Sequence, residues 1–170
     1  IGMCTNLLNL LLSDADAPGA TESGIDLVKR KVRHLVVMGG REDGESEWNF
    51  AGCGGIGKDC GSYDNLGNVT NRSLALWPAA DAPISYLPFG AGVGVRTGEV
   101  LDEGVPESSP CRVGYLAFRQ ALPTWCTFGG RASWDPMAVL YSVRGPQGVY
   151  REVAGHNVVD PASGANIFTA

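Results

Sequence analysis

Side chains that commonly act as catalytic nucleophiles or bases are few and far apart in this sequence. The two histidines, His34 and His156, stand alone. None of the serines Ser46, Ser85 and Ser133 lies in the G-x-S-x-G setting of a serine nucleophile. The sequence also contains no Cys-x-x-Cys pair of the kind that binds zinc. The pattern therefore disfavours both a Ser-His-Asp hydrolase and a zinc enzyme.

A better-placed set of polar residues follows a short apolar run. Leu35 to Met38 is unbroken and apolar and ends in Gly39-Gly40, which is typical of a buried parallel strand that leads into a loop. The polar stretch 41–67 follows, contains Glu47 and Asn49, and is too long for a simple connection. Ligands of open α/β sheets bind beyond the carboxyl ends of the strands, so we expect residues here to reach a ligand.

Two helix starts place further polar residues. Thr5 opens the apolar run Leu7 to Leu12, so we expect a helix with Thr5 or Asn6 near its N-cap. Pro136 suits a first helical turn, which places Trp134 and Asp135 at the N-terminus of a second helix. Further helices are expected at 71–77 and 111–122, a strand at 83–89, and a terminal hairpin from 149–153 and 157–160.

Alternating helix and strand patterns predict a single domain, residues 1–170, of the α/β class. The expected architecture is an open, mainly parallel Rossmann-like sheet with flanking helices. The glycine run at 90–94 lacks the full fingerprint of a dinucleotide-binding loop.

Four segments together resemble the inosine-uridine-type nucleoside hydrolases, and they extend over nearly the whole chain. Their order and approximate spacing also agree with the family. The similar segments are 1–6 (IGMCTN, family L-G-P-L-T-N), 36–40 (VVMGG, family V-V-M-G-G), 47–50 (EWNF, family E-F-N-F) and 134–138 (WDPMA, family H-D-P-L-A).

The resemblance implies a role for each polar residue singled out above. Asp135 would bind Ca²⁺ through its carboxylate and Thr5 through its backbone carbonyl, both hard oxygen donors. Glu47 and Asn49 would hydrogen-bond the ribose hydroxyls, with Met38 packed beneath the sugar. The implied activity is hydrolysis of the N-glycosidic bond of a ribonucleoside, through a transition state with oxocarbenium character that nearby carboxylates favour.

Trp134 departs from the family pattern, which commonly has histidine before the metal-binding Asp. The tryptophan resembles the purine-specific branch, in which an indole stacks on the base. Stacking of an aromatic ring on a nucleobase contributes roughly 1–3 kcal/mol. The resemblance therefore favours purine nucleosides as substrates.

The family's N-terminal D-T-D-x-G-x-D-D cluster is absent from these residues. Residues 14–19 do not replace it, because they follow a helix and lack paired aspartates. We therefore expect no general-base Asp in this chain, and we expect the N-terminal strands of the family to be missing from it. The preferred interpretation is one part of a nicked or split enzyme that needs an N-terminal fragment of the same protein. The alternative is a non-catalytic extracellular binding protein with a degenerate nucleoside pocket.

Composition limits the partners. The net charge of −5 and the absence of a long Lys/Arg cluster disfavour nucleic acid as a partner. The apolar runs fall short of the roughly 20 residues that cross a bilayer, so no membrane partner is expected. Association of the chain with copies of itself is left open by the sequence.

Two features favour a secreted, extracellular glycoprotein. Asn68 and Asn71 each begin a glycosylation sequon. The five cysteines suit disulfide use, although free thiols are the alternative. The candidates are Cys53 and Cys60, which bracket a glycine-rich loop, and Cys111 and Cys126, which flank an expected helix.

Overall fold

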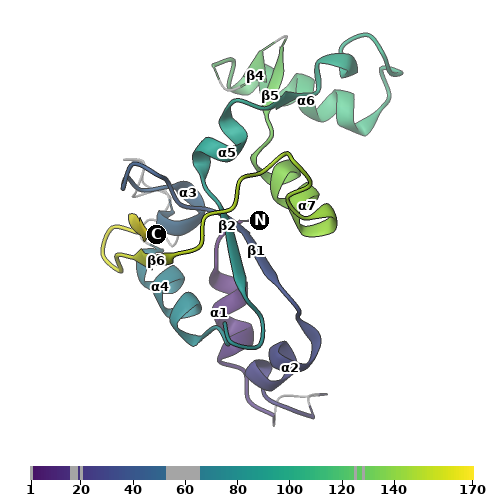
Figure 1. Ribbon diagram of the computed structural model, residues 1–170. Helices are drawn as coiled ribbons and strands as arrows, with labels where there is room; N and C mark the ends of the chain where they lie inside the picture. The colour runs from purple at the N-terminus through teal and green to yellow at the C-terminus, as the bar shows by residue number, and fades with distance from the viewer. Residues whose placement is uncertain (1, 16–18, 20, 53–65, 125, 128) are drawn as a thin grey trace.

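The computed structural model describes residues 2–15, 19, 21–52, 66–124, 126–127 and 129–170. Its helices and strands alternate irregularly, in a mixed α/β arrangement (Figure 1). In chain order the elements are α1 (Thr5–Leu11), α2 (Gly24–Lys31), β1 (Leu35–Met38), α3 (Trp48–Ala51), α4 (Gly67–Leu76), β2 (Ile84–Leu87), α5 (Phe89–Val93), β3 (Arg96–Thr97), the 3₁₀ helix η3 (Glu99–Leu101), α6 (Pro110–Ala121), β4 (Cys126–Thr127), β5 (Gly130–Ala132), α7 (Trp134–Arg144), β6 (His156–Val159) and β7 (Asn166–Thr169).

The strands β1 and β2 form a parallel pair at the centre of the molecule. Their register aligns Leu35 with Ile84 and Met38 with Leu87. The chain passes between them through α3 and α4, as a parallel crossover requires. Both runs were expected as strands, and the parallel pairing of the buried run is confirmed.

The sheet is smaller than the sequence predicted. Within the described residues, the parallel sheet has two strands, and the other strands pair antiparallel. The expected open, mainly parallel sheet is therefore not formed by the part of the chain that the structure describes. The predicted α/β class stands. The terminal hairpin is formed by β6 and β7, so the expected strand at 157–160 is found, but its partner is 166–169 and not 149–153.

Both faces of the β1–β2 pair are covered, which explains the unbroken apolar run. On one face Met38 and Leu87 pack against Met137, Ala138 and Tyr141 of α7. The other face packs against residues from α1, α2, α3 and β6, namely Leu11, Val28, Phe50 and Val159 with Trp77 and Ala82. Figure 1 shows α7 on one side of the pair, with α1 and α4 on the other.

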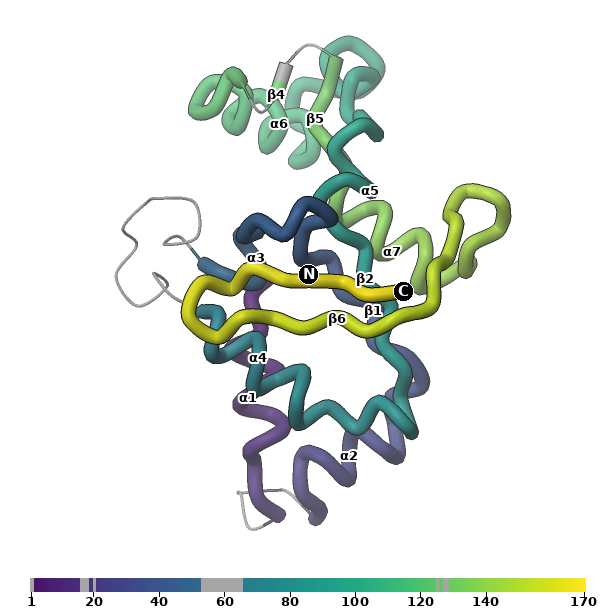
Figure 2. Tube along the Cα trace, turned by 60° about the vertical axis from the view of Figure 1, so that its left-hand side comes forward, coloured from purple at the N-terminus to yellow at the C-terminus, as the bar shows by residue number. Residues whose placement is uncertain are grey.

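A lobe made of α6 and β3–β5 projects from one end of the molecule (Figures 1 and 2). The helix α6 was expected at 111–122, with the apolar residues Val113, Leu116, Ala117 and Leu122 on one side. In the structure α6 has no buried residue, and the side chain of Val113 is 52% exposed. The main packing partners of α6 in the described residues are β4 and η3, which leave most of the helix surface exposed.

The helix α2 was not predicted, although its start carries a sequence signal. The Oγ of Ser23 accepts a hydrogen bond from the backbone N–H of Asp26 and donates one to its carboxylate. Ser23 is therefore the N-cap of α2, and its hydroxyl also bonds the Asp26 side chain in the first turn. None of the helices in the described segments combines the length and apolar character needed to span a bilayer.

Candidate functional site

Met38 ends β1 inside the core, and the two glycines that follow it allow the chain to turn. The side chain of Met38 is 3% exposed. A Cβ on Gly39 would lie 2.4 Å from Cε1 of Phe50, and Gly40 has φ of +83°, a backbone conformation that side chains rarely adopt. The glycine pair is therefore required by the close approach of α3 to the end of the strand.

Glu47 caps α3 and holds the turn at Gly40. Its Oε2 accepts hydrogen bonds from the backbone N–H of Asn49 at 2.9 Å and of Gly40 at 3.2 Å. The residue is 7% exposed. Burial raises the pKa of the Glu47 carboxyl above its ordinary value, the two N–H donors oppose that shift, and the charge of Asp135 adds to it.

Asn49 joins this group from the first turn of α3. Its Nδ2 donates to the carbonyl oxygen of Met38 at 3.1 Å and lies 3.1 Å from the Met38 sulfur. Met38, Glu47 and Asn49, which the sequence assigned to the sugar, therefore form one hydrogen-bonded unit at the carboxyl end of β1. The same contacts give both polar residues a structural role, because each satisfies or orients the backbone around the strand end.

Asp135 is linked to this unit by its charge, whereas Thr5 begins α1 and is joined to the unit by no described contact. Asp135 is exposed in the first turn of α7, and its charge acts on Glu47. Thr5 is the first residue of α1 and follows Cys4. The pKa of the Cys4 thiol is raised by burial and, to a smaller extent, by the charge of Glu47. Asp135 therefore lies near enough to act on Glu47, and the placement of Thr5 beside them stays a prediction.

The indole of Trp134 already has partners within the protein. Its Nε1 donates to the carbonyl oxygen of Phe89 at 2.8 Å, and the two rings lie 5.1 Å apart with a 35° tilt. The guanidinium carbon of Arg131 lies 5.1 Å from the indole. A base that stacks on Trp134 must therefore extend or displace this arrangement.

The residues present do not by themselves fit a calcium ion. Among the described residues, no group of three or more His, Cys, Asp or Glu side chains lies close enough to hold a metal. Asp135 and the Thr5 carbonyl would supply two oxygen ligands, whereas calcium takes about six to eight. The remaining oxygen ligands of a calcium site would have to come from outside these residues.

The structure joins neither Cys111 nor Cys126, two of the four disulfide candidates of the sequence, in a disulfide bond. Cys4, Cys111 and Cys126 are free thiols. Cys111 is exposed at the start of α6, whereas Cys126 is 1% exposed and its Sγ lies 3.9 Å from the carbonyl oxygen of Tyr115. The two thiols therefore lie in different environments of the lobe. The other candidates, Cys53 and Cys60, lie outside the described residues.

Thiol reactivity should reflect this difference. A pulse of iodoacetamide on the native protein should alkylate Cys111 at least about 100-fold faster than Cys126 and Cys4, whose labelling needs local opening. Peptide mapping by mass spectrometry gives the rates, and labelling in urea is the control. A Cys111–Cys126 linked peptide in a non-reducing digest would contradict the assignment.

Both glycosylation candidates lie in α4. Asn68 is exposed, but the Nδ2 of Asn71, the atom to which a glycan attaches, donates to the carbonyl oxygen of Val159 at 2.8 Å. Thr70 of the first sequon is fully buried and its Oγ1 donates to the carbonyl oxygen of Phe50. Modification of Asn71 would therefore have to precede folding of α4 against the hairpin.

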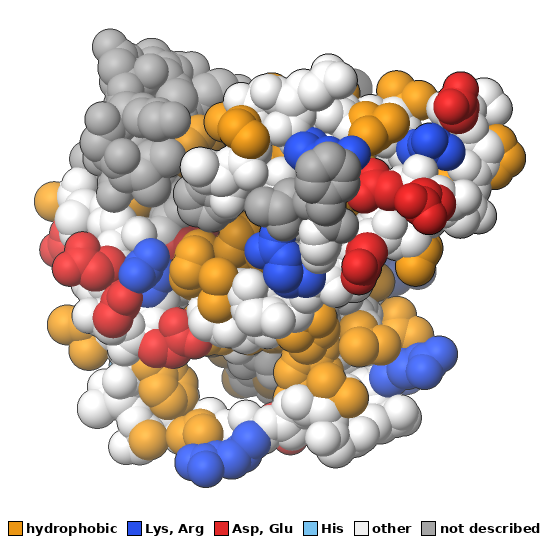
Figure 3. Space-filling view, turned by 90° about the horizontal axis from the view of Figure 1, so that it is seen from above, with side chains coloured by type: hydrophobic (Ala, Val, Ile, Leu, Met, Phe, Trp, Pro, Cys, Tyr) orange, Lys and Arg blue, Asp and Glu red, His pale blue; other side chains and the backbone are white. Residues whose placement is uncertain are grey.

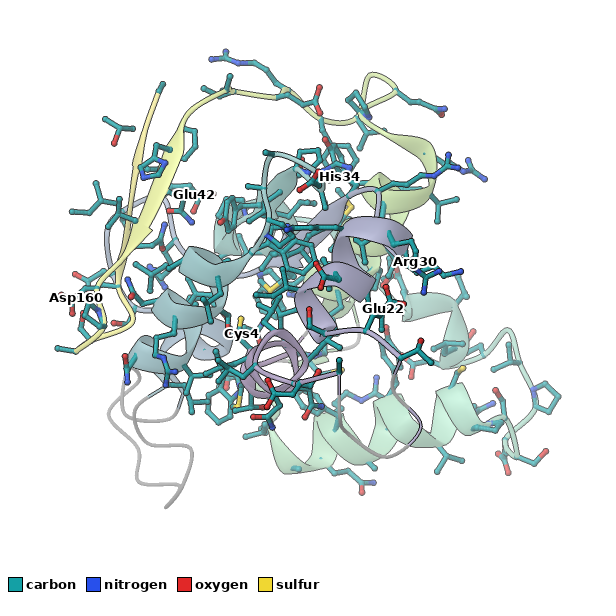
Figure 4. All side chains as sticks on the ribbon, turned by 90° about the horizontal axis from the view of Figure 1, so that it is seen from below. Cys4, Glu22, Arg30, His34, Glu42 and Asp160 are labelled. Atoms are coloured by element: carbon teal, nitrogen blue, oxygen red, sulfur yellow. The ribbon has the colours of Figure 1, made fainter. Side chains whose placement is uncertain are left out.

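A hydrogen-bonded chain that sequence reasoning missed crosses the α7 face of the sheet. Its members span residues 34–152 of the sequence, so no local pattern reveals them. They are His34 Nε2, Ser85 Oγ at 2.9 Å from it, Tyr141 OH at 3.1 Å from the serine, and Glu152, which accepts from the tyrosine. Figure 4 shows His34 apart from Cys4.

The direction of donation excludes a Ser-His nucleophile here. The hydroxyl of Tyr141 donates a hydrogen bond to the Glu152 carboxylate, and this bond raises the pKa of the tyrosine. Ser85 must then donate to Tyr141, which leaves His34 as donor to the serine rather than as its base. The chain of bonds therefore serves to tie the segment at Glu152 to α7 and β2.

Charge on the surface agrees with the composition. On the face seen in Figure 3, Lys and Arg side chains lie among acidic and apolar ones and do not gather into one patch. Such a face offers no continuous positive track for a polyphosphate backbone.

Comparison with known proteins adds no assignment: no family model, no curated protein and no solved structure matches this chain.

Proposed function

We propose that this chain is the ribose- and base-binding part of a purine nucleoside hydrolase. Completed by an N-terminal fragment that carries an Asp-rich strand end, it would hydrolyse the N-glycosidic bond of purine ribonucleosides to free base and ribose. The reaction would be calcium-dependent, with most of the oxygen ligands supplied by that fragment. We also propose a secreted location, in keeping with the two sequons.

One observation carries the proposal: a buried carboxylate at the carboxyl end of a parallel strand, within the field of a second carboxylate. Glu47 is 7% exposed, and Asp135 raises its pKa. Asn49 and Met38 are bonded beside it. These residues come from two of the four segments that resemble the family, and Asp135 comes from a third.

The chain's own residues suggest what this group would do. A nucleoside whose glycosidic bond breaks develops positive charge on the sugar, and a nearby carboxylate stabilises that charge. Glu47 would hold its negative charge in a largely desolvated position, where its field is less screened than at the surface. Its bonds to the N–H groups of Gly40 and Asn49 fix the carboxylate before substrate arrives.

The fold leaves room for completion. A two-stranded parallel sheet is small, and isolated strand pairs are marginally stable. We propose that the N-terminal fragment adds strands to β1 and β2, which would produce the open, mainly parallel Rossmann-like sheet of the family. It would also bring its acidic groups to the strand end where Glu47 and Asp135 lie.

Complementation tests the proposal directly. The chain is co-expressed with an N-terminal fragment of a nucleoside hydrolase that ends where the resemblance begins. The purified assembly should release hypoxanthine from inosine, and a calcium chelator should reduce release by at least about 100-fold, since the ion's charge would be lost from the site. Restoring calcium is the control. An assembly that forms yet releases no hypoxanthine at saturating calcium would overturn the catalytic proposal.

A second function is favoured by the contacts of Trp134. Its Nε1 and ring are already engaged by Phe89 and Arg131, and no metal-binding group is formed within the described residues. These features suit a non-catalytic extracellular binding protein with a degenerate nucleoside pocket. Inosine binding by the assembly without release of base would support this alternative.

A further inference from the structure

A hollow of about 520 Å³ lies between α4, β2 and β6, and it is called the β6 groove below. Its first wall includes Asn71 and Ala75 of α4, its second includes Ile84 and Tyr86 of β2, and its third is the run 155–159. Figure 2 shows β6 crossing the molecule next to α4. The volume falls within the roughly 300–1,000 Å³ of typical ligand sites.

The third wall is one edge of β6. All five residues of the run 155–159 border the hollow, although successive side chains of a strand point to opposite faces. A wall of this kind is formed by the edge of a strand and not by one of its faces. The other edge of β6 pairs with β7, and no other described strand lies beside β6. The β6 groove therefore follows the open edge of the hairpin.

The register of the hairpin shows which backbone groups point into the β6 groove. The N–H of Asp160 donates to the carbonyl oxygen of Ala165, and residues of an antiparallel strand alternate between bonding the partner strand and facing away from it. Asn157 and Val159 therefore direct their backbone groups away from β7. In agreement, the carbonyl oxygen of Val159 accepts a hydrogen bond from Asn71 Nδ2. Within the described residues, the backbone N–H and C=O of Asn157 have no partner.

The walls favour an uncharged, extended peptide. Among the described lining residues none is Lys, Arg, Asp or Glu, and most are apolar. A charged segment would lose water here without gaining an ion pair. An extended peptide offers Asn157 both a backbone acceptor and a backbone donor, and it directs every second side chain toward one wall.

The total surface of the chain leaves room for such a partner. The chain exposes 10277 Å², whereas a folded monomer of 17.9 kDa exposes about 8,000 Å². The difference of roughly 2,000 Å² exceeds the area of about 800 Å² that each partner buries in an interface of standard size. This surplus accommodates a bound peptide in addition to the proposed N-terminal fragment.

We propose that the β6 groove binds an extended, uncharged and largely apolar segment of a partner protein, which adds a third strand to the β6–β7 hairpin. The segment bonds the backbone of Asn157 and packs its apolar side chains against α4 and β2. Glu47 and Asn49 do not line this groove. Failure of the nucleosidase proposal therefore leaves this inference standing, and its own failure leaves the nucleosidase proposal standing.

Titration with a synthetic peptide tests the inference. The probe is a peptide of three threonine-valine repeats with both ends blocked, and the isotope-labelled chain is followed by nuclear magnetic resonance. The amide signals of Asn157 and Val158 should shift, with a Kd of about 1 mM or below. Hydrogen exchange at the Asn157 amide should slow by at least about 10-fold in the saturated complex. Absence of these shifts at about 5 mM peptide overturns the inference.

Two modified peptides identify the backbone bonds. One is N-methylated at its threonines and the other at its valines. The alternation of the two residues fixes which side chains meet the wall, so only one of the two sets of N–H groups faces β6. One modified peptide should bind at least about 10-fold more weakly than the probe, and the other should bind within about threefold of it. Equal affinity of all three peptides overturns the inference.

Asn157→Pro and Asn157→Ala form a matched pair. Both lose the bond that the Asn157 side chain accepts from Asn166, but only the proline variant loses the N–H that faces the groove. This N–H is not part of the hairpin ladder, and proline is tolerated at such edge positions. Asn157→Pro should bind the probe at least about fivefold more weakly than Asn157→Ala. Equal affinities of the two folded variants overturn the inference.

A steric variant keeps the test independent of the fold of β6. Ala75 is exposed on α4, and Ala75→Phe would narrow the groove. Its affinity for the probe should fall by at least about 10-fold, since the ring takes the place of bound side chains. Ala117→Phe, at an exposed position of α6, should stay within about twofold. Equal affinities of these two variants overturn the inference.

A second copy of the chain is the rival occupant. Sedimentation velocity should show a monomer, and the Asn157 amide should exchange freely before peptide is added. A dimer in which this amide is already protected would assign the β6 groove to self-association and overturn the inference.

Discussion

Replacing Phe50 with alanine is expected to lower the free energy of unfolding by about 3–5 kcal/mol. The side chain is fully buried and packs with Val37 and Val159, which links α3 to β1 and to the terminal hairpin. Removal of the ring would leave a cavity behind Gly39 and Gly40, both of which rest against it. Urea denaturation followed by circular dichroism measures the change.

Phe168 provides the matched control for this substitution. Its side chain is 44% exposed on β7, so Phe168→Ala should cost no more than about 1 kcal/mol. Equal losses for the two variants would contradict the assignment of Phe50 to the core. Because Phe50 lies in the short helix that Glu47 caps, its loss should also disturb the candidate site before global unfolding.

The parts of the structure that the sequence predicted are those with short-range signals. The apolar run before Gly39-Gly40 indicated a strand buried on both faces, and β1 is covered by α7 on one side and by α1 and α2 on the other. Pro136 in the first turn of α7 located Trp134 and Asp135 at a helix N-terminus. In each case the backbone chemistry of a few neighbouring residues decides the outcome.

The parts that the sequence did not predict depend on contacts between distant segments. Periodicity predicted α6, but it did not show that the helix lies in a projecting lobe and has no buried residue. The stacked contacts of Trp134 and the bonds from His34 to Glu152 join residues that no local pattern relates. The size of the parallel sheet likewise depends on which strands meet, and two runs alone do not decide it.

The candidate site lies between these two cases. Glu47 and Asn49 were grouped with Met38 through resemblance to a family, and the structure places all three in one hydrogen-bonded unit. The hydrogen bonds of Glu47 and Asn49 to the backbone were not predicted. The Glu47 carboxylate therefore caps α3 and also places a negative charge at the end of the strand. A substitution at Glu47 should therefore affect stability and activity through different properties of that side chain.

Glu47→Gln separates these properties, because glutamine retains an acceptor oxygen for the N–H groups of Gly40 and Asn49 but carries no charge. The pKa of Glu47 is raised in the folded state, mainly by burial. The protonated carboxyl is thus favoured by folding, and its contribution to stability is present at low pH and lost as pH rises through the raised pKa. At neutral pH, Glu47→Gln should be at least as stable as the unmodified chain. The pH dependence of the free energy of unfolding that comes from titration of Glu47 should disappear in this variant.

Activity should change in the opposite direction. In the complemented assembly, Glu47→Gln should lower kcat/KM for inosine by about 100-fold, since the charge that favours the positive sugar is removed. The unmodified assembly should gain activity as pH rises through the raised pKa of Glu47, because the ionised form is the active one.

Glu45→Gln is the control, because Glu45 lies two residues away and is exposed. It removes one negative charge from the same segment. The free energy of unfolding should stay within about 0.5 kcal/mol of that of the unmodified protein, and kcat/KM should stay within about twofold. A Glu47→Gln variant that loses stability at neutral pH would show that the charge itself is needed to hold Gly40 and Asn49. A variant that keeps full activity would show that the buried carboxylate has only a structural role, and the catalytic proposal would lose the residue on which it depends.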